Sequence, residues 1–298
     1  MYLLKCFFLH FKVFKACKVE INQKQFTLIL ISRRSVNRFG TRLFSRGIDE
    51  NGHVSNFVET EQIILYNQDR ASFVQIRGSI PLHWSQLPNL RYKSPITIAP
   101  YSSHQKSMSK HVQYILSQFE SMMMINLVNH TGPEKVLLTK FCQIFHDITN
   151  QFPNVTLECF DFHHECRHNR WDKLNKLLEA ISSHIDSYSY FASVNHYNCT
   201  NDEIKYRFQK GCFRTNCIDS IDRTNVVQSL IAKCSLERQL QQFGIILVGQ
   251  QIEHFPSFYY VYRNSIIFFL VSLFCILVLL IHCSYNFYFL FLLINSLG

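Results

Sequence analysis

Cys217 and Arg223 are the two residues whose types and spacing could carry out chemistry. Five residues separate them. A segment of this length can curl so that successive backbone N–H groups point inward and form a cradle for an anion at a helix N-terminus. The same positive field would lower the pKa of the cysteine, so that a thiolate could attack phosphorus. Arg223 would bind phosphate oxygens through two donors. The pair therefore predicts cysteine-dependent phosphatase chemistry.

A helix is predicted directly after this pair. Apolar residues recur there at helical spacing, and Gly244 is a typical helix stop. The apolar positions are Val226, Val227, Leu230, Ile231, Cys234 and Leu240. Residues 216–223 should therefore form a loop that leads into a helix N-terminus. Thr224 adds a hydroxyl that could assist the leaving thiolate.

The loop resembles the active-site loop of the Sac-domain phosphoinositide phosphatases. That family usually carries the pattern RxNCxDCLDRTN, and residues 214–225 read RTNCIDSIDRTN. Further blocks that look like the family are Ile31–Ser35, Arg46–Asp49, Asn56–Gln62, Ser72–Pro81, Phe160–His163 and Arg170–Asp172. The resemblance spans about Thr27 to Asn264 and is closest to the Sac1-type lipid phosphatases of the endoplasmic reticulum and Golgi. So many blocks in one order make it specific.

The resemblance implies a role for each residue of the loop. Cys217 would be the nucleophile that forms a phosphocysteine, and Arg223 would bind the phosphate. Asp222 is the first candidate for the general acid, by similarity to the myotubularin-type loop, and Asp219 is the second. The positive field of the loop opposes protonation of either carboxylate. The substrate-binding candidates are Asn216, Ser220, Thr224 and Asn225. No metal or other cofactor is expected, because cysteine and arginine supply the nucleophile and the electrostatics.

Three departures from the family pattern stand out. Ser220 replaces the second cysteine of the loop, which removes an oxidation partner and keeps the nucleophile. Little before Thr27 matches the family, so we expect a truncated β-rich N-terminal lobe. After Asn264 the family continues with catalytic-domain sequence, whereas this chain turns apolar.

An α/β fold with a partly parallel sheet should position the loop. The first β-prone runs are Leu28–Ile31, Arg42–Arg46, Val54–Val58, Gln62–Tyr66 and Ser72–Arg77. Helical patterns at His111–Glu120, Lys135–Thr149 and Asp172–Ser187 then alternate with strand candidates at Met122–Val128 and Thr156–Phe162. We therefore expect a Cys-x5-Arg phosphatase core. The predicted regions are a basic, apolar segment (1–26), a remnant of the β-rich Sac lobe (27–100), an incomplete catalytic region (101–264) and a hydrophobic tail (265–298).

The tail contains no Asp, Glu, Lys or Arg. Residues 266–294 are long enough to insert into a bilayer as a hydrophobic C-terminal helix. Arg263 is the last charge, so the catalytic region would face the cytosol, on endoplasmic reticulum or Golgi membranes. The competing interpretation is translated non-coding sequence. At the other end, Met1 to Ile31 fit a membrane-leaning amphipathic segment or a weak signal peptide.

The net charge of +9 predicts an anionic partner. The basic residues are scattered, and no block is long enough for a nucleic-acid arm, which favours phosphoinositide lipids in membranes. Arg77, Lys93 and Arg170 are candidate contacts to lipid head groups, although solvated arginines are the commoner case. The 11 cysteines include no CxxC pair, which is typical of free thiols in a reducing compartment. Cys159, His163, His164, Cys166 and His168 cluster without a standard zinc spacing, so packing or support of the phosphate site is favoured.

Three functions compete on this sequence. The first is an active phosphatase that removes one phosphate from phosphatidylinositol 4-phosphate or 3-phosphate. The second is a catalytically impaired Sac-domain protein that binds lipid or protein. The third is a protein tyrosine phosphatase, which the aspartates inside the loop disfavour, because protein phosphatases usually carry small uncharged residues there.

Overall fold

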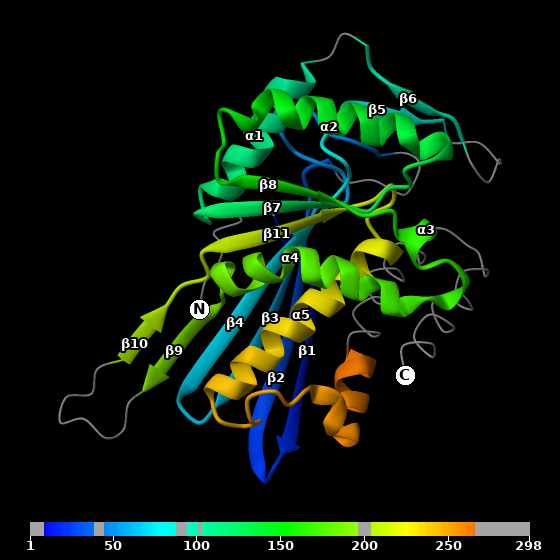
Figure 1. The fold of residues 1–298 in the computed structure, drawn as a ribbon. Coiled ribbons are helices and arrows are strands. Elements are labelled where there is room, and N and C mark those ends of the chain that lie inside the picture. Colours follow the sequence, from blue (N-terminus) through cyan, green and yellow to red (C-terminus); the bar gives the residue numbers. More distant parts are fainter. Residues whose placement is uncertain (1–8, 39–44, 88–93, 101–102, 196–203, 266–298) are drawn as a thin grey trace.

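One large mixed sheet organises the described part of the chain (Figure 1). The computed structural model describes residues 9–38, 45–87, 94–100, 103–195 and 204–265. Within these residues, nine strands join in the order β1-β2-β3-β4-β11-β7-β8, while β9 pairs with both β4 and β10. Their bounds are β1 Leu9–Ile21, β2 Lys24–Ser35, β3 Val58–Tyr66, β4 Asp69–Arg77, β7 Ser121–Asn126, β8 Val155–Cys159, β9 Phe191–Asn195, β10 Ile204–Arg207 and β11 Gly211–Asn216. A separate two-stranded sheet joins β5 (Trp84–Gln86) and β6 (Ile96–Ile98).

The first four strands are antiparallel neighbours joined by hairpins or, between β2 and β3, by a longer connection. Asn22 and Gln23 turn the chain between β1 and β2 with positive φ angles, as a tight hairpin requires. Strand β1 corrects the interpretation of the N-terminal region as a membrane-leaning or signal segment over residues Leu9–Ile21, while residues 1–8 lie outside the described part of the chain. From Val13 to Ile21 the odd positions are buried or half-buried and most even positions are exposed, so the basic and apolar residues follow a strand period. The predicted boundary at residue 27 falls inside β2.

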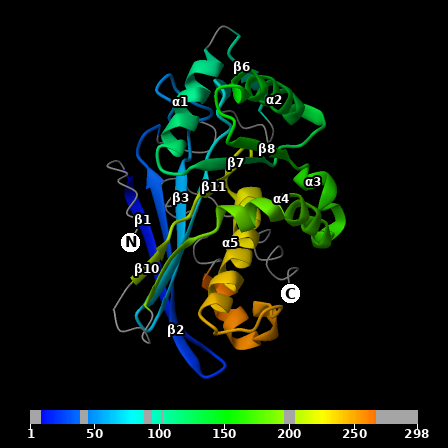
Figure 2. The same ribbon diagram turned by 60° about the vertical axis from the view of Figure 1, so that its left-hand side comes forward.

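The second half of the sheet is parallel. Strand β11 lies between β4 and β7, and β8 follows β7, all running in one direction. Helices α1 (His104–Leu116) and α2 (Lys135–Thr149) cover one face of these strands, and α4 (Leu174–Tyr188) and α5 (Asp222–Gln242) cover the other (Figures 1 and 2). The expected mixed α/β fold is confirmed.

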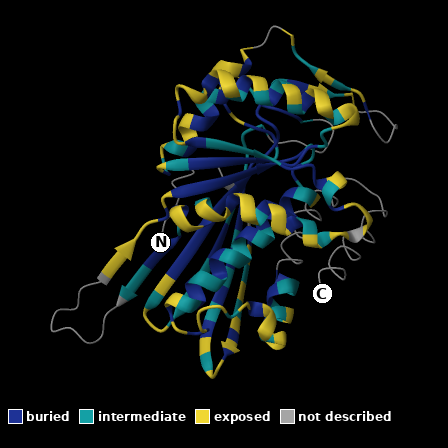
Figure 3. Ribbon diagram, in the orientation of Figure 1, coloured by how far each residue is buried: buried dark blue, intermediate teal, exposed yellow. Residues whose placement is uncertain are grey.

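Each face of the sheet has its own apolar core, as the buried strands between half-exposed helices indicate (Figure 3). Along β7, Met122 and Met124 pack toward α1 and α2, whereas Met123 and Ile125 pack toward α4 and α5. This alternation is the period of a strand buried on both sides. It fixes which neighbouring residue faces which helix layer.

Short helices complete the described chain. They are η1 Gly132–Glu134, α3 Phe162–Glu165, η2 Arg167–Asn169, η3 Trp171–Lys173 and η4 Ile252–His254, and residues 256–265 are helical as well. None of the helices formed by the described residues is both long and apolar enough to cross a bilayer. The predicted hydrophobic helix over 266–294 lies outside the described residues.

Candidate active site

Cys217 lies at the carboxyl end of the central strand β11. The strand ends at Asn216, the loop covers 217–221, and α5 begins at Asp222. Ligand sites in α/β sheets typically form at the carboxyl ends of parallel strands, next to helix N-termini. The order of a loop followed by a helix agrees with the prediction, although the loop is shorter than the predicted residues 216–223, because Asn216 belongs to β11 and Asp222 and Arg223 belong to α5. Cys217 itself is 2% exposed.

The loop directs backbone N–H groups toward the sulfur. Ser220 has a φ of 53°, which turns the chain back, and its backbone N donates to the Cys217 Sγ at 3.1 Å. Burial raises the pKa of the Cys217 thiol; Arg223 and the N–H groups of Ser220 and Ile221 lower it, and Asp219 raises it further. The net direction is upward, so the expectation of a lowered pKa is wrong for this conformation. The physical reason is that a thiolate loses its hydration here.

Arg223 is held in the first turn of α5 by acceptors from the segment after β7. Its two terminal nitrogens each donate to a different carboxylate oxygen of Glu134 at 2.8 Å, and Nη1 also donates to the Leu127 carbonyl at 2.9 Å. Burial opposes the charge of Arg223, but the bonds to Glu134 and the charge of Cys217 outweigh it and raise the pKa. Arg223 is therefore a fixed cation beside the cysteine.

Glu134 was not predicted from the sequence. It ends the η1 turn, directly before α2, and its Oε2 also accepts the backbone N–H of Asn129 at 2.8 Å. Position offers the signal that could have found it: β7 is the parallel neighbour of β11, so the segment after β7 must lie beside the loop after β11. A carboxylate in that segment is within reach of Arg223.

The carboxylate of Asp219 forms an ion pair with Arg46. Its carboxylate accepts from Nη2 of Arg46, whose side chain is 2% exposed, and Nη1 of Arg46 donates to the Ile218 carbonyl at 3.2 Å. This pair joins the loop to the segment before β3. The ion pair gives Asp219 a structural role in holding the loop.

Two of the four predicted substrate-binding residues, Asn216 and Thr224, use their side chains for hydrogen bonds inside the fold. Asn216 donates to Asn126 Oδ1 at 2.6 Å and accepts from Arg214 at 2.9 Å, and it is fully buried. The Thr224 hydroxyl donates to the Ile221 carbonyl at 3.0 Å rather than to Cys217. Ser220 contributes its backbone N–H, and its hydroxyl is buried without a partner. Asn225 is also buried and continues the first turn through a bond from its N to the Ile221 carbonyl.

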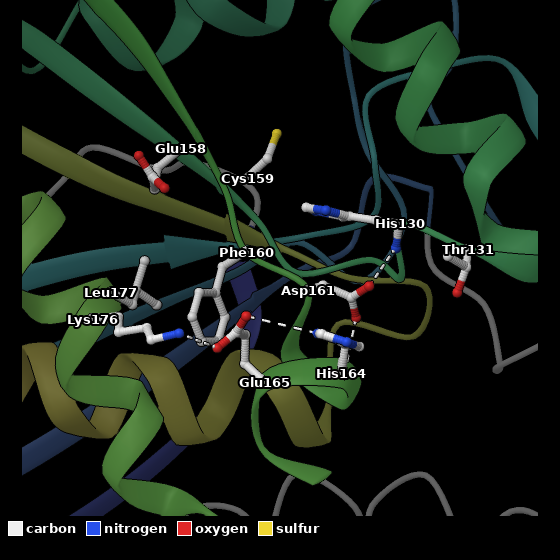
Figure 4. A pocket seen from close by; sticks show the side chains of 10 residues that line it. All are labelled: His130, Thr131, Glu158, Cys159, Phe160, Asp161, His164, Glu165, Lys176 and Leu177. Atoms are coloured by element: carbon white, nitrogen blue, oxygen red, sulfur yellow. Dashed lines mark hydrogen bonds and ion pairs between the residues drawn. The ribbon is translucent and has the colours of Figure 1, made fainter.

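A hollow of about 400 Å³ lies beside the loop that carries Glu134 (Figure 4). Asp161 joins its two walls: one carboxylate oxygen accepts the backbone N of His130 at 2.8 Å, and the other accepts the backbone N of His164 at 3.1 Å. Charges of both signs line it, including the ion pair of Lys176 with Glu165 at 2.8 Å. The described residues contain no group of three or more side chains arranged to hold a metal ion.

A protein-family model described as the SacI homology domain matches residues 2–167. The chain belongs to this family. The match begins at residue 2, so the expected start of the resemblance at Thr27 is too late. Hairpin β1–β2 explains the difference, because both of its strands belong to the matched lobe.

Several relatives are similar to this chain over most of its length. The chain is 45% identical over 237 residues to the phosphatidylinositol-3-phosphatase SAC1 of Drosophila melanogaster. The aligned residues make up 80% of this chain and 39% of the relative. The chain is 43% identical over 255 residues to the phosphatidylinositol-3-phosphatase SAC1-A of Danio rerio, with 86% and 42% covered. The Saccharomyces cerevisiae SAC1 phosphatase is 33% identical over 257 residues. The chain thus spans about two fifths of the length of these relatives.

Proposed function

We propose that the chain hydrolyses the phosphate monoester of a phosphatidylinositol phosphate, at the 4- or 3-position, through a phosphocysteine intermediate. The observation that carries the proposal is the position of Cys217, between N–H groups at the start of α5 and the fixed cation Arg223. The names of the SAC1 relatives, which are phosphatidylinositol phosphatases, support the substrate class.

Each residue then has a defined task. The Cys217 thiolate forms a bond to phosphorus while the bond from phosphorus to the inositol oxygen breaks. Arg223 and the N–H groups of Ser220 and Ile221 stabilise the charge on the transferred group. Asp222 donates a proton to the leaving oxygen. Water then cleaves the phosphocysteine and releases inorganic phosphate, which regenerates the thiol. Because the substrate is a membrane lipid, we also propose that the protein acts at a cytosolic membrane surface.

A phosphate-release assay on short-chain phosphoinositides tests this function. The wild-type chain should release phosphate, and Cys217→Ser and Arg223→Ala should each lower the rate by at least about a hundredfold. A panel of phosphotyrosine peptides should give little release. Equal rates for wild type and Cys217→Ser on every substrate would refute the mechanism.

A second candidate function is lipid binding without turnover. The burial of Cys217 and its raised pKa favour it, because both disfavour the thiolate in this conformation. In that case phosphoinositide vesicles would retain the chain while no phosphate is released. The Cys217→Ser variant would then bind the same vesicles as tightly as wild type.

A further inference from the structure

Arg77 ends strand β4 on the inner side of the candidate site. The strand register places it opposite Thr215 of β11, two residues before Cys217, and opposite Val58 of β3. Val58 in turn lies opposite Arg34 of β2. Residues directly opposite one another in a sheet share a face. Arg34, Val58, Arg77 and Thr215 therefore form one row across four strands.

This row faces α5. Gln75, two residues before Arg77 and hence on the same face, donates to the Gln228 carbonyl of α5 at 2.9 Å. Asp222, the first residue of α5, and Cys217 both attract the charge of Arg77. The guanidinium of Arg77 thus lies between the sheet and the start of α5, beneath the loop. It is 4% exposed, which corrects the interpretation of Arg77 as a solvated arginine or a direct head-group contact.

The buried guanidinium of Arg77 is not fully satisfied. Its Nε is buried without a hydrogen-bond partner. Burial, followed by repulsion from Arg34, lowers the pKa of Arg77 to about 10, while Cys217 and Asp222 act in the opposite direction. The group therefore remains a cation at neutral pH. Buried charges are normally paired, and an exception needs an explanation.

Arg33, the neighbour of Arg34 on the opposite face of β2, shows what a purely structural buried arginine looks like in this chain. Its two terminal nitrogens donate to Glu59 and Glu61, so its charge is matched within the sheet. Arg77 has no such carboxylate on its own row, where its neighbours are Val58 and Thr215. The oppositely charged groups that act on it are Cys217, in the loop, and Asp222, at the start of α5.

We propose that Arg77 is a positioning residue that stabilises the ionised form of Cys217 from the sheet side of the loop. The thiolate and the Asp222 carboxylate would supply the counter-charges that the row lacks. Arg223 would then bind the phosphate, while Arg77 would favour ionisation of the Cys217 thiol. This inference rests on the proposed function only in assigning Cys217 as the nucleophile.

The charges around Cys217 set its titration. Within the described part of the chain they are Arg223 with its partner Glu134, Asp219 with its partner Arg46, Asp222, and Arg77 with Arg34 behind it. Removing Arg77 leaves the other pairs in place. The change in titration then reports Arg77 itself.

Thiolate formation at Cys217 can be measured without turnover. The ultraviolet absorbance of the thiolate is titrated against pH for each protein and for its Cys217→Ser counterpart, so that the other cysteines cancel in the difference. Arg77→Met should move the midpoint of Cys217 upward by about one pH unit or more. Arg77→Lys, which keeps the cation, should stay closer to wild type. Arg33→Met, a matched buried control on the other face, should leave the midpoint unchanged.

Circular dichroism and thermal unfolding establish that each variant is folded, and Arg77→Gln, which keeps a polar group, replaces Arg77→Met if the latter does not fold. An unchanged midpoint in a folded Arg77→Met or Arg77→Gln chain would overturn the inference. So would an equal shift in Arg33→Met. If the shift is observed but wild type releases no phosphate, the inference stands and the proposed function fails.

Discussion

Glu134 engages both terminal nitrogens of Arg223, with the two Nη–Oε distances equal at 2.8 Å. A guanidinium offers two edges to planar acceptors, and this contact occupies the Nη1–Nη2 edge. Within the described residues Nε of Arg223 makes no hydrogen bond, so a phosphate could approach the guanidinium along its Nε–Nη2 edge. Both side chains are mostly buried, at 12% and 13% exposure, which protects the pair from solvent screening. Glu134 therefore sets the direction in which Arg223 presents its charge.

We expect Glu134→Gln to lower kcat for phosphate release by about ten- to a hundredfold, with a smaller change in KM. An amide offers one acceptor oxygen, so the paired contact is lost and Arg223 can rotate. Steady-state kinetics on a short-chain phosphoinositide measure the effect. Glu179→Gln, at an exposed position on α4, is the control and should match wild type. A folded Glu134→Gln chain with unchanged kcat would show that Glu134 does not orient Arg223.

Local sequence signals predicted the parts of the site that lie within one segment. The loop at Cys217 and the helix after it were predicted from apolar periodicity and the Gly244 stop, and α2 was predicted at its observed bounds, Lys135–Thr149, whereas strand β11 before the loop was not predicted. No local pattern predicted Glu134 or Arg46, because each contacts a residue far away in the sequence. Glu134 binds Arg223, and Arg46 binds the Ile218 carbonyl. Such contacts depend on the order of the strands, which no local pattern encodes.

The pKa of Cys217 illustrates a second limit. The sequence shows which charges accompany the cysteine, but the sign of the shift depends on how completely the thiol loses its hydration. Burial outweighs Arg223 in this conformation. Strand β1 was missed for a different reason, because Lys and Phe alternate there in a pattern that also suits a membrane surface.

The roles of Asp222 and Asp219 can be separated with leaving groups of different basicity. Asp222→Asn should lower kcat about a hundredfold on an inositol phosphate but only about threefold on 4-methylumbelliferyl phosphate, whose leaving group needs little protonation. Asp219→Asn should lower kcat by a similar factor on both substrates, because it acts through Arg46 and the shape of the loop. Equal losses on both substrates for Asp222→Asn would remove it as the acid.

Alanine substitutions at Gly47 and Gly132 can be compared to measure how much a close backbone contact contributes to stability. Their φ angles are 67° and 68°, so an alanine strains the backbone equally at both. A Cβ at Gly47 would lie 2.3 Å from the Leu82 carbonyl oxygen, whereas a Cβ at Gly132 meets nothing within 4 Å. We expect Gly132→Ala to cost about 1 kcal/mol and Gly47→Ala about 3 kcal/mol or more in the free energy of unfolding. Urea denaturation measures both, and similar losses would contradict the role of the contact.

His111 should make the protein sensitive to acid. Burial, followed by the nearby charge of Arg214, holds the pKa of His111 well below its usual value of 6.5. Its Nδ1 lies 3.0 Å from the Gly52 carbonyl and its Nε2 lies 3.3 Å from Nε of Arg214, contacts that suit a neutral ring. As the pH falls below 6.5, His111 binds a proton in the unfolded chain, whereas its lowered pKa keeps the ring neutral in the folded chain. The free energy of unfolding should therefore decrease on acidification.

The expected contribution of this single histidine is at most about 1.4 kcal/mol per pH unit between pH 6.5 and its folded pKa. Urea denaturation at pH 7, 6 and 5 gives the dependence for wild type and for His111→Gln, and the difference in slope isolates His111 from the other histidines. The variant should be less stable than wild type at pH 7 and should lose less stability on acidification. Parallel curves for wild type and His111→Gln would mean that the ring at this position accepts its proton as readily in the folded chain as in the unfolded one.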